Sequence, residues 1–276
     1  MPFHLSPDQI KQIKNLFQQA DSLIISAGAG MGVDSGLPDF RGNQGMWQAY
    51  PELGKQRIDF TEIANPAAFK RHPRLAWGFY GHRLALYRQT TPHSGFLQLK
   101  QLAEILELPN FVFTSNVDGQ FQKAGFNPDH IYECHGSIHH LQCLDACTQT
   151  IWPADELKPE IDHQDCQWLG QLPQCPYCDG LARPNILMFN DMGWLSHQHD
   201  LQAKHLKAFL KDHQRPVVIE MGAGTAIPTV RYFSEQFASG LIRINLREYT
   251  LPAQGGIALA TTAEQGVRGI YQIFIE

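Results

Sequence analysis

A glycine-rich loop follows the short apolar strand Leu23-Ile24-Ile25, and it reads Gly28-Ala29-Gly30-Met31-Gly32-Val33-Asp34-Ser35-Gly36-Leu37-Pro38-Asp39-Phe40-Arg41-Gly42. Closely spaced glycines let a backbone turn sharply and approach a ligand, and their free N–H groups bind pyrophosphate. The pattern departs from the dehydrogenase fingerprint, because Val33 stands where the third glycine belongs and only Glu52 lies near position 50 to hold a ribose. We therefore expect a dinucleotide-binding loop that serves chemistry other than hydride transfer.

Apolar strands recur along the chain, with helical stretches between several of them. We predict strands over about 22–26, 111–114, 131–133, 184–189, 216–221, 241–245 and 270–275. A helix begins after Ser6, because Ser6 and Gln9 can form a capping box around Pro7, and further helices are expected over 77–88 and 96–106. This alternation predicts the α/β class, with a doubly wound, Rossmann-like parallel sheet covered on both faces.

Composition excludes several classes of protein. The 276 residues carry a formal net charge of −5, which argues against direct binding of nucleic acid, and 43% of them are hydrophobic, enough for a core. No segment approaches the ~18 unbroken apolar residues of a membrane span. The first 17 residues have no signal-peptide core. We expect a cytoplasmic protein that binds neither membrane nor nucleic acid.

Four of the six cysteines form two closely spaced pairs, Cys143-x3-Cys147 and Cys175-x2-Cys178. Paired short spacings in a reducing compartment are typical of a metal site. Four thiolates bind zinc in a closed tetrahedral site that is structural, because no position is left for substrate. Cys134 and Cys166 lie outside the pairs, and we rank His139, His140 and His163 as less favoured substitutes.

Several segments, read in order with the glycine-rich loop, resemble the sirtuin family of NAD-dependent protein deacylases. The resemblance covers about Leu23 to Glu248. It is carried by Thr114-Ser115-Asn116-Val117-Asp118-Gly119, Glu133-Cys134-His135-Gly136-Ser137, the two cysteine pairs, Gly222-Ala223-Gly224 and Asn245. It implies one catalytic unit over 1–276, with a large NAD-binding domain at about 1–45, 96–140 and 183–276. Insertions at about 46–95 and 141–182 would form a smaller helical, zinc-binding domain.

The resemblance also implies roles for individual residues. His135 would be the general base, since a neutral imidazole accepts a proton at cellular pH. Asn116 and Asp118 would complete the catalytic set. The residues expected to bind NAD are Gly28, Ala29, Gly30, Gly36, Asp39, Phe40, Arg41, Trp47, Ser115, Gly222, Ala223, Gly224, Asn245 and Glu248.

The substrate would be an acylated lysine of another protein, and Phe189 would contact it. Tyr80 and Arg83 form the Tyr-x-x-Arg pair of sirtuins that remove succinyl or malonyl groups, and residues three apart share a helix face. Asp191 introduces a carboxylate that would compete for Arg83.

The chain departs from the sirtuin pattern at Gly32, Ser115, Gln120-Phe121, Asn190-Asp191 and Ala223-Gly224. These replacements leave other NAD reactions open, namely ADP-ribosyl transfer to protein or plain NAD hydrolysis. A non-catalytic module that binds NAD or zinc is a third alternative, which the retained Asn116, Asp118 and His135 disfavour. The expected activity is NAD-dependent removal of acetyl, succinyl or malonyl groups from lysine, giving nicotinamide and O-acyl-ADP-ribose.

Overall fold

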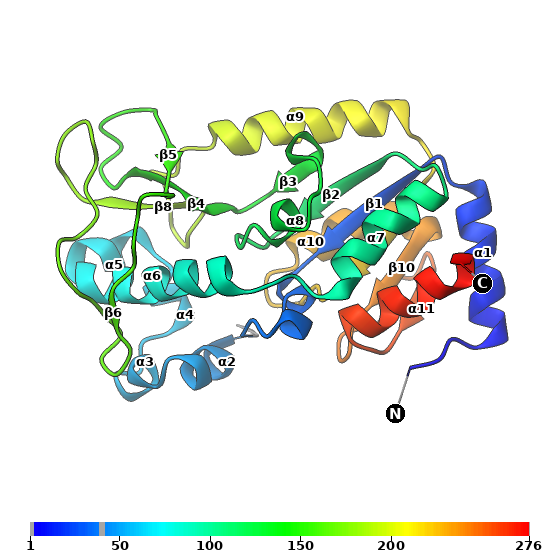
Figure 1. Cartoon of the computed structure of the whole chain (residues 1–276), viewed down its shortest axis with the longest axis horizontal. Helices are drawn as coiled ribbons and strands as arrows, with labels where there is room; N and C mark the ends of the chain where they lie inside the picture. Colours follow the sequence, from blue (N-terminus) through cyan, green and yellow to red (C-terminus); the bar gives the residue numbers. More distant parts are fainter. Residues whose placement is uncertain (1–2, 39–41, 276) are drawn as a thin grey trace.

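A parallel sheet of six strands forms the larger part of the molecule (Figure 1). The structure is a computed structural model that describes residues 3–38 and 42–275. The strand order is β11-β10-β9-β1-β2-β3. The strands are β1 (Ser22–Ala27), β2 (Asn110–Thr114), β3 (Ile131–Glu133), β9 (Pro216–Met221), β10 (Leu241–Ile244) and β11 (Ile257–Leu259). The strand order reverses between β1 and β9, which is where sheets of this kind open a crevice at the carboxyl ends of their strands.

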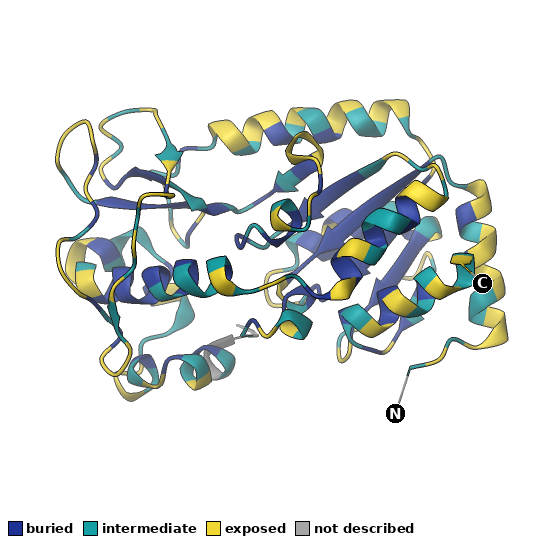
Figure 2. Ribbon diagram, in the orientation of Figure 1, coloured by how far each residue is buried: buried dark blue, intermediate teal, exposed yellow. Residues whose placement is uncertain are grey.

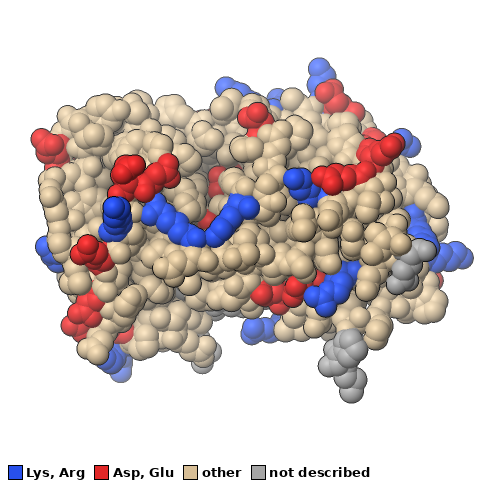
Figure 3. Space-filling view, in the orientation of Figure 1, with Lys and Arg blue, Asp and Glu red and all other residues tan. Residues whose placement is uncertain are grey.

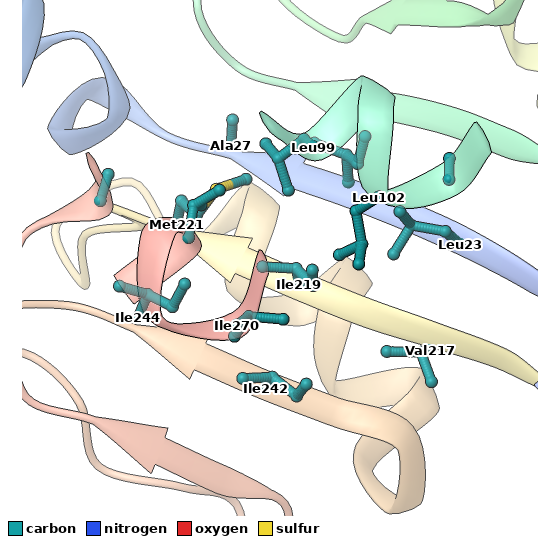
Figure 4. Packing of buried hydrophobic residues seen from close by; sticks show 14 of the residues in the cluster. Leu23, Ala27, Leu99, Leu102, Val217, Ile219, Met221, Ile242, Ile244 and Ile270 are labelled. Carbon is teal, nitrogen blue, oxygen red and sulfur yellow. The ribbon is translucent and has the colours of Figure 1, made fainter. Parts of the chain in front are cut away.

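Alternating residues of the strands pack into two separate cores, one on each face of the sheet. Leu23 and Ile25 of β1 belong to one core, whereas Ile24 between them belongs to the other. Figure 4 shows part of the first core, where Leu99 and Leu102 of a helix lie against strand residues. Because both faces are covered, the strands are buried along nearly their whole length (Figure 2), and this explains their unbroken apolar sequence.

Helices on both sides supply the layers that cover the sheet. The first core contains residues of α1 (Pro7–Gln19), α7 (Ser94–Ile105) and α11 (Ala263–Ile275). The second contains residues of α9 (His197–Asp212) and α10 (Thr229–Ser234). The start of α1 confirms the predicted capping box, since the Ser6 and Gln9 side chains each accept the other's backbone N–H.

A second region lies beyond the carboxyl ends of β1 and β2 (Figure 1). A three-stranded antiparallel sheet in the order β5-β4-β8 is accompanied by a two-stranded one, β6-β7. Its helices are α2 (Gly42–Ala49), α3 (Pro51–Lys55), α4 (Phe60–Ile63), α5 (Pro66–Arg71) and α6 (Pro73–Gln89). Its strands are β4 (Gly136–Cys143), β5 (Trp152–Pro153), β6 (Ile161–Asp162), β7 (Gln167–Trp168) and β8 (Ala182–Ile186). A third core, rich in aromatic residues such as Trp77, Phe79 and Trp168, holds this region together.

Most of the predicted strands are confirmed, and two expectations need correction. The segment 270–275 is not a strand but the end of α11, whose Gly266, Val267 and Ile270 are buried at helical spacing. The sixth strand of the parallel sheet is instead β11, a three-residue segment too short to show a pattern. The segment 184–189 does overlap a strand, β8, but β8 pairs antiparallel with β4 outside the parallel sheet.

None of the helices described within 3–38 and 42–275 combines the length and the apolar character needed to cross a membrane.

Candidate active site

A cavity of about 390 Å³ opens where the strand order reverses between β1 and β9. It collects residues that follow four strands of the parallel sheet, together with side chains from α4, α6 and α10. The lining residues are Gly28, Ala29, Leu37, Pro38, Phe60, Thr61, Arg83, Tyr87, Ser115, Asn116, Val117, Asp118, His135, Phe189, Gly222, Ala223, Gly224, Ala226, Ile227 and Val230. Eleven of these are predicted site residues from segments far apart in the chain.

The glycine-containing loops that follow β1 and β9 contact each other beside this cavity, with almost no space between their backbones. A Cβ on Gly28 would lie 2.8 Å from the Cα of Ala223, and a Cβ on Gly222 would lie 2.4 Å from Gly30. Gly222 also has a φ of +60°, which side chains rarely adopt. The contact of two bare backbones keeps this part of the cavity open, which suits the close approach of a pyrophosphate.

His135 lies between β3 and β4, with its imidazole partly buried at the cavity wall. Burial lowers the pKa of His135, although a hydrogen bond to the Ser115 backbone acts in the opposite direction. Its Nε2 lies 3.5 Å from the hydroxyl of Thr229. A neutral imidazole with a lowered pKa is in the correct state to accept a proton at pH 7.

Asn116 and Asp118 follow β2 and turn toward the same cavity. The Asn116 amide Nδ2 donates to the backbone oxygen of Gly28 at 3.1 Å, which connects this loop to the glycine-rich loop. Asp118 is 8% exposed, and burial raises its pKa to about 6, while the Gln120 N–H and the charge of Arg83 act in the opposite direction. Asp118 therefore carries most of its negative charge at neutral pH, next to the cationic Arg83.

Arg83 lines the cavity, but the phenol beside it belongs to Tyr87. The Arg83 Nε and Nη2 donate to the Tyr87 hydroxyl at 2.9 and 2.7 Å. Tyr80 is 1% exposed and stacks on Phe69 in the aromatic core, and it is not among the cavity-lining residues that the structure describes. Tyr87 was not among the predicted site residues, although its spacing of four from Arg83 places both on one helix face.

Asn245 and Glu248 hold the second glycine-containing loop, Gly222-Ala223-Gly224, and the residue after it. Asn245 Nδ2 donates to the Ala223 oxygen at 2.9 Å, and its Oδ1 accepts the backbone N–H groups of Arg247 and Glu248. Glu248 accepts the N–H and the hydroxyl of Thr225. A smaller hollow of about 60 Å³, lined among others by Gly30, Gly222 and Asn245, lies on this side of the two contacting loops.

The remaining predicted residues fall in three groups. Phe189 lines the cavity and meets Phe60 edge to face at 5.8 Å between ring centroids. Gly36 and Trp47 do not line the cavity among the described residues: Gly36 has a φ of +86°, and the Trp47 indole donates to the Ile58 oxygen at 2.8 Å. Asp39, Phe40 and Arg41 lie outside the residues that the structure describes.

The four paired cysteines come from two separate stretches of the chain, and their sulfur atoms lie together at one point in the structure. All four Sγ atoms lie within 4.8 Å of one another, with Cys143 and Cys178 at 3.8 Å and Cys147 and Cys175 at 3.6 Å. A tetrahedron of zinc–sulfur bonds of about 2.3 Å has sulfur–sulfur edges of about 3.8 Å. The thiols therefore fit one zinc ion, whereas Cys134 and Cys166 lie outside this group.

On the face of the molecule seen in Figure 3, Lys and Arg side chains lie among Asp and Glu side chains, and most of the visible surface carries neither. The exposed ion pair Lys70–Asp145 is one example of opposite charges side by side.

Comparison with known proteins places the chain in a family. The model of the Sir2 family matches residues 28–211, which include the glycine-rich loop, His135 and all four paired cysteines. The chain belongs to the Sir2 family. The Sir2 match begins at the first glycine of the loop, so β1 and the segment before it lie outside the match.

Curated relatives of this Sir2 chain align over most of its length. An NAD-dependent protein deacylase of Thermococcus sibiricus is 29% identical over 244 residues, which are 87% of this chain and 86% of the relative. One of Aquifex aeolicus is 27% identical over 257 residues, 92% of this chain and 96% of the relative.

A solved Sir2 homolog–NAD complex has a TM-score of 0.72 at 23% identity, and the match covers 99% of this chain and 96% of that one. A Sir2 structure described under the mechanism and regulation of Sir2 enzymes has a TM-score of 0.69 at 21% identity, with 98% and 99% covered. At these identities the solved structures establish the shared fold.

Proposed function

We propose that this chain is an NAD-dependent protein-lysine deacylase that yields free lysine, nicotinamide and O-acyl-ADP-ribose. The observation that carries the proposal is the convergence of His135, Asn116 and Asp118 on one cavity with both glycine loops. The names of the curated relatives support it. We further propose the division into a large NAD-binding domain and a smaller zinc-binding one, and a cytoplasmic location.

NAD fits the contact between the two glycine loops. Gly28, Ala29 and Gly30 would bind the pyrophosphate through backbone N–H groups, and Gly222, Ala223 and Gly224 would bind from the opposite loop. Asn245 and Glu248, on the far side of this contact, would hold the adenosine half. Ser115 and the segment Asp39-Phe40-Arg41 would hold the nicotinamide half, with Arg41 suited to pair with phosphate.

The chemistry needs an electrophile and a base. NAD supplies the electrophile, a ribose carbon that accepts the acyl oxygen as nicotinamide leaves. His135 Nε2 would take the proton of a ribose hydroxyl, as the lowered pKa of His135 allows. Asp118, charged at neutral pH, would favour the positive charge that develops at this ribose, and Asn116 would orient a hydroxyl or a water.

The acyl group would reach Arg83 and Tyr87. Arg83 lines the cavity and is 9% exposed, and its Nε and Nη2 donate to the Tyr87 hydroxyl, so its guanidinium is placed where a carboxylate on the acyl chain could pair with it. We therefore propose a preference for succinyl or malonyl over acetyl groups, with Phe189 along the lysine side chain. Tyr80 is enclosed in the aromatic core, so it would contribute by packing and would not touch the acyl group.

A panel of acetyl-, malonyl-, succinyl- and longer acyl-lysine peptides, incubated with NAD and analysed by mass spectrometry, tests the proposal. We expect deacylated peptide and O-acyl-ADP-ribose in equal amounts, and a loss of about 10²–10⁴-fold in His135→Ala while NAD binding persists. Nicotinamide released equally with and without peptide would instead indicate NAD hydrolysis. A peptide that gains the mass of ADP-ribose would indicate transferase activity, and no turnover of NAD with any peptide would indicate a non-catalytic module.

A further inference from the structure

Thr229 stands next to the proposed general base, although nothing in its sequence context marks it. It is the first residue of α10, directly after Pro228, and its Oγ1 lies 3.5 Å from His135 Nε2. The two residues are separated by 94 positions, so only the fold brings them together. A distance of 3.5 Å is long for a hydrogen bond, but contacts of catalytic groups commonly tighten when substrate binds.

The helix that carries Thr229 is firmly held. The next residue, Val230, is buried and lines the cavity. Ser234, one turn later and fully buried, shares a 2.7 Å hydrogen bond with Ser26 of β1 and donates to the Val230 oxygen. The hydroxyl of Thr229 is therefore presented by a helix fixed to the central strand.

The second contact of His135 determines what Thr229 can do. Nε2 faces Thr229, which leaves Nδ1 for the hydrogen bond with the Ser115 backbone. That bond raises the pKa of His135, as a bond donated by the ring to a carbonyl does. In a neutral ring with its proton on Nδ1, Nε2 is a bare acceptor, and the Thr229 hydroxyl is the donor directed at it.

We propose that Thr229 is a positioning residue for His135: its hydroxyl donates to Nε2, holds the plane of the ring and favours the neutral imidazole. This inference rests on the proposed role of His135 as the base.

The test replaces the hydroxyl and keeps the shape. In Thr229→Val the pKa of His135, measured by NMR titration of the ring nitrogens, should rise by about 0.5 unit, because a donor that favours the neutral form is lost. Thr229→Ser should restore the wild-type value. Thr90→Val is the matched control, since it removes a hydroxyl that bonds to the Leu86 oxygen outside the cavity, and it should leave His135 unchanged.

The kinetic measurement distinguishes positioning from simple structural support. Thr229→Val should lower kcat about 3–10-fold and leave the KM for NAD unaltered, with the acid limb of the pH profile moved upward, and Thr229→Ser should recover it. An unchanged pKa of His135 in Thr229→Val would overturn the inference. Because the NMR titration needs no turnover, it decides the role of Thr229 even if the deacylase proposal fails.

Discussion

Asp191 is bound to Arg183 and not to Arg83. The Arg183 Nη1 and Nη2 donate to the two Asp191 oxygens at 2.7 and 2.8 Å, and both side chains are fully buried. Asp191 also accepts the backbone N–H groups of Met188 and Gly193. The carboxylate that the sequence places near the acyl pocket is therefore neutralised from within β8, and the competition for Arg83 does not arise.

Removing one partner of this ion pair should destabilise the protein strongly. Asp191→Asn leaves Arg183 as an uncompensated buried cation, which costs about 3–5 kcal/mol in unfolding free energy. The exposed pair Lys70–Asp145, at 2.9 Å with both side chains more than half exposed, is the internal control, and Asp145→Asn should cost less than about 1 kcal/mol. Urea unfolding of both variants checks the contrast, and equal losses would show that burial does not govern these pairs.

The four cysteines should hold about one zinc ion per chain, as a closed thiolate site does. Cys175→Ala should lower the thermal midpoint of the whole protein, because Cys175 is fully buried and metal binding contributes to folding. Cys134→Ala is the matched control outside the group: it should keep the full metal content. Elemental analysis of protein purified without a metal-binding tag measures the stoichiometry, and a zinc-free preparation of undiminished stability would exclude the site.

Arg83 should determine acyl preference. Arg83→Met should lower desuccinylation about 10–100-fold, since a hydrogen bond to a charged group contributes about 1.5–3 kcal/mol, and should spare whatever deacetylation exists. Tyr87→Phe removes the hydroxyl that holds Arg83 and should weaken the preference more mildly. Measurement of kcat/KM for paired succinyl and acetyl peptides checks both variants. If wild type prefers acetyl peptides and Arg83→Met leaves the ranking unaltered, the cavity has no acidic-acyl site.

Glu133 should make stability depend on pH. It is 5% exposed, and burial, aided by the charge of Asp118, raises its pKa to about 7 from an ordinary value of 4.5. The folded state then holds a proton that the unfolded chain releases, so the contribution of Glu133 to the unfolding free energy should fall by about 1–3 kcal/mol as pH rises from about 4.5 to 7.

Glu133→Gln should remove that slope, and Glu104→Gln, at an exposed position on α7, should keep it. Urea unfolding at pH 5, 6, 7 and 8 measures the difference between variants, so that other titrating groups such as His135 cancel. A slope that persists unchanged in Glu133→Gln would assign the pH dependence to other residues.

Local sequence patterns predicted most of the strands of the parallel sheet and the start of the first helix. Unbroken apolar strands such as Leu23–Ile25 can only be buried on both faces, and the Ser6–Gln9 capping box needs nothing beyond its own turn. The end of the final helix was predicted as a strand and β11 was not predicted, and both errors have a similar cause. An apolar run such as 270–275 suits a buried helix as well as a strand, and three residues at 257–259 carry no period.

Spacing alone was enough to nominate the four cysteines, because paired short spacings are typical of a metal site. His135, Asn116 and Asp118 were nominated through the resemblance of their segments to the sirtuin family. Which side chains meet was decided only by tertiary structure. Tyr87 in place of Tyr80 beside Arg83, Arg183 opposite Asp191, and Thr229 against His135 all depend on how separate elements pack. Such pairings follow from the rotation and depth of each helix and strand in the cores, which no single segment encodes.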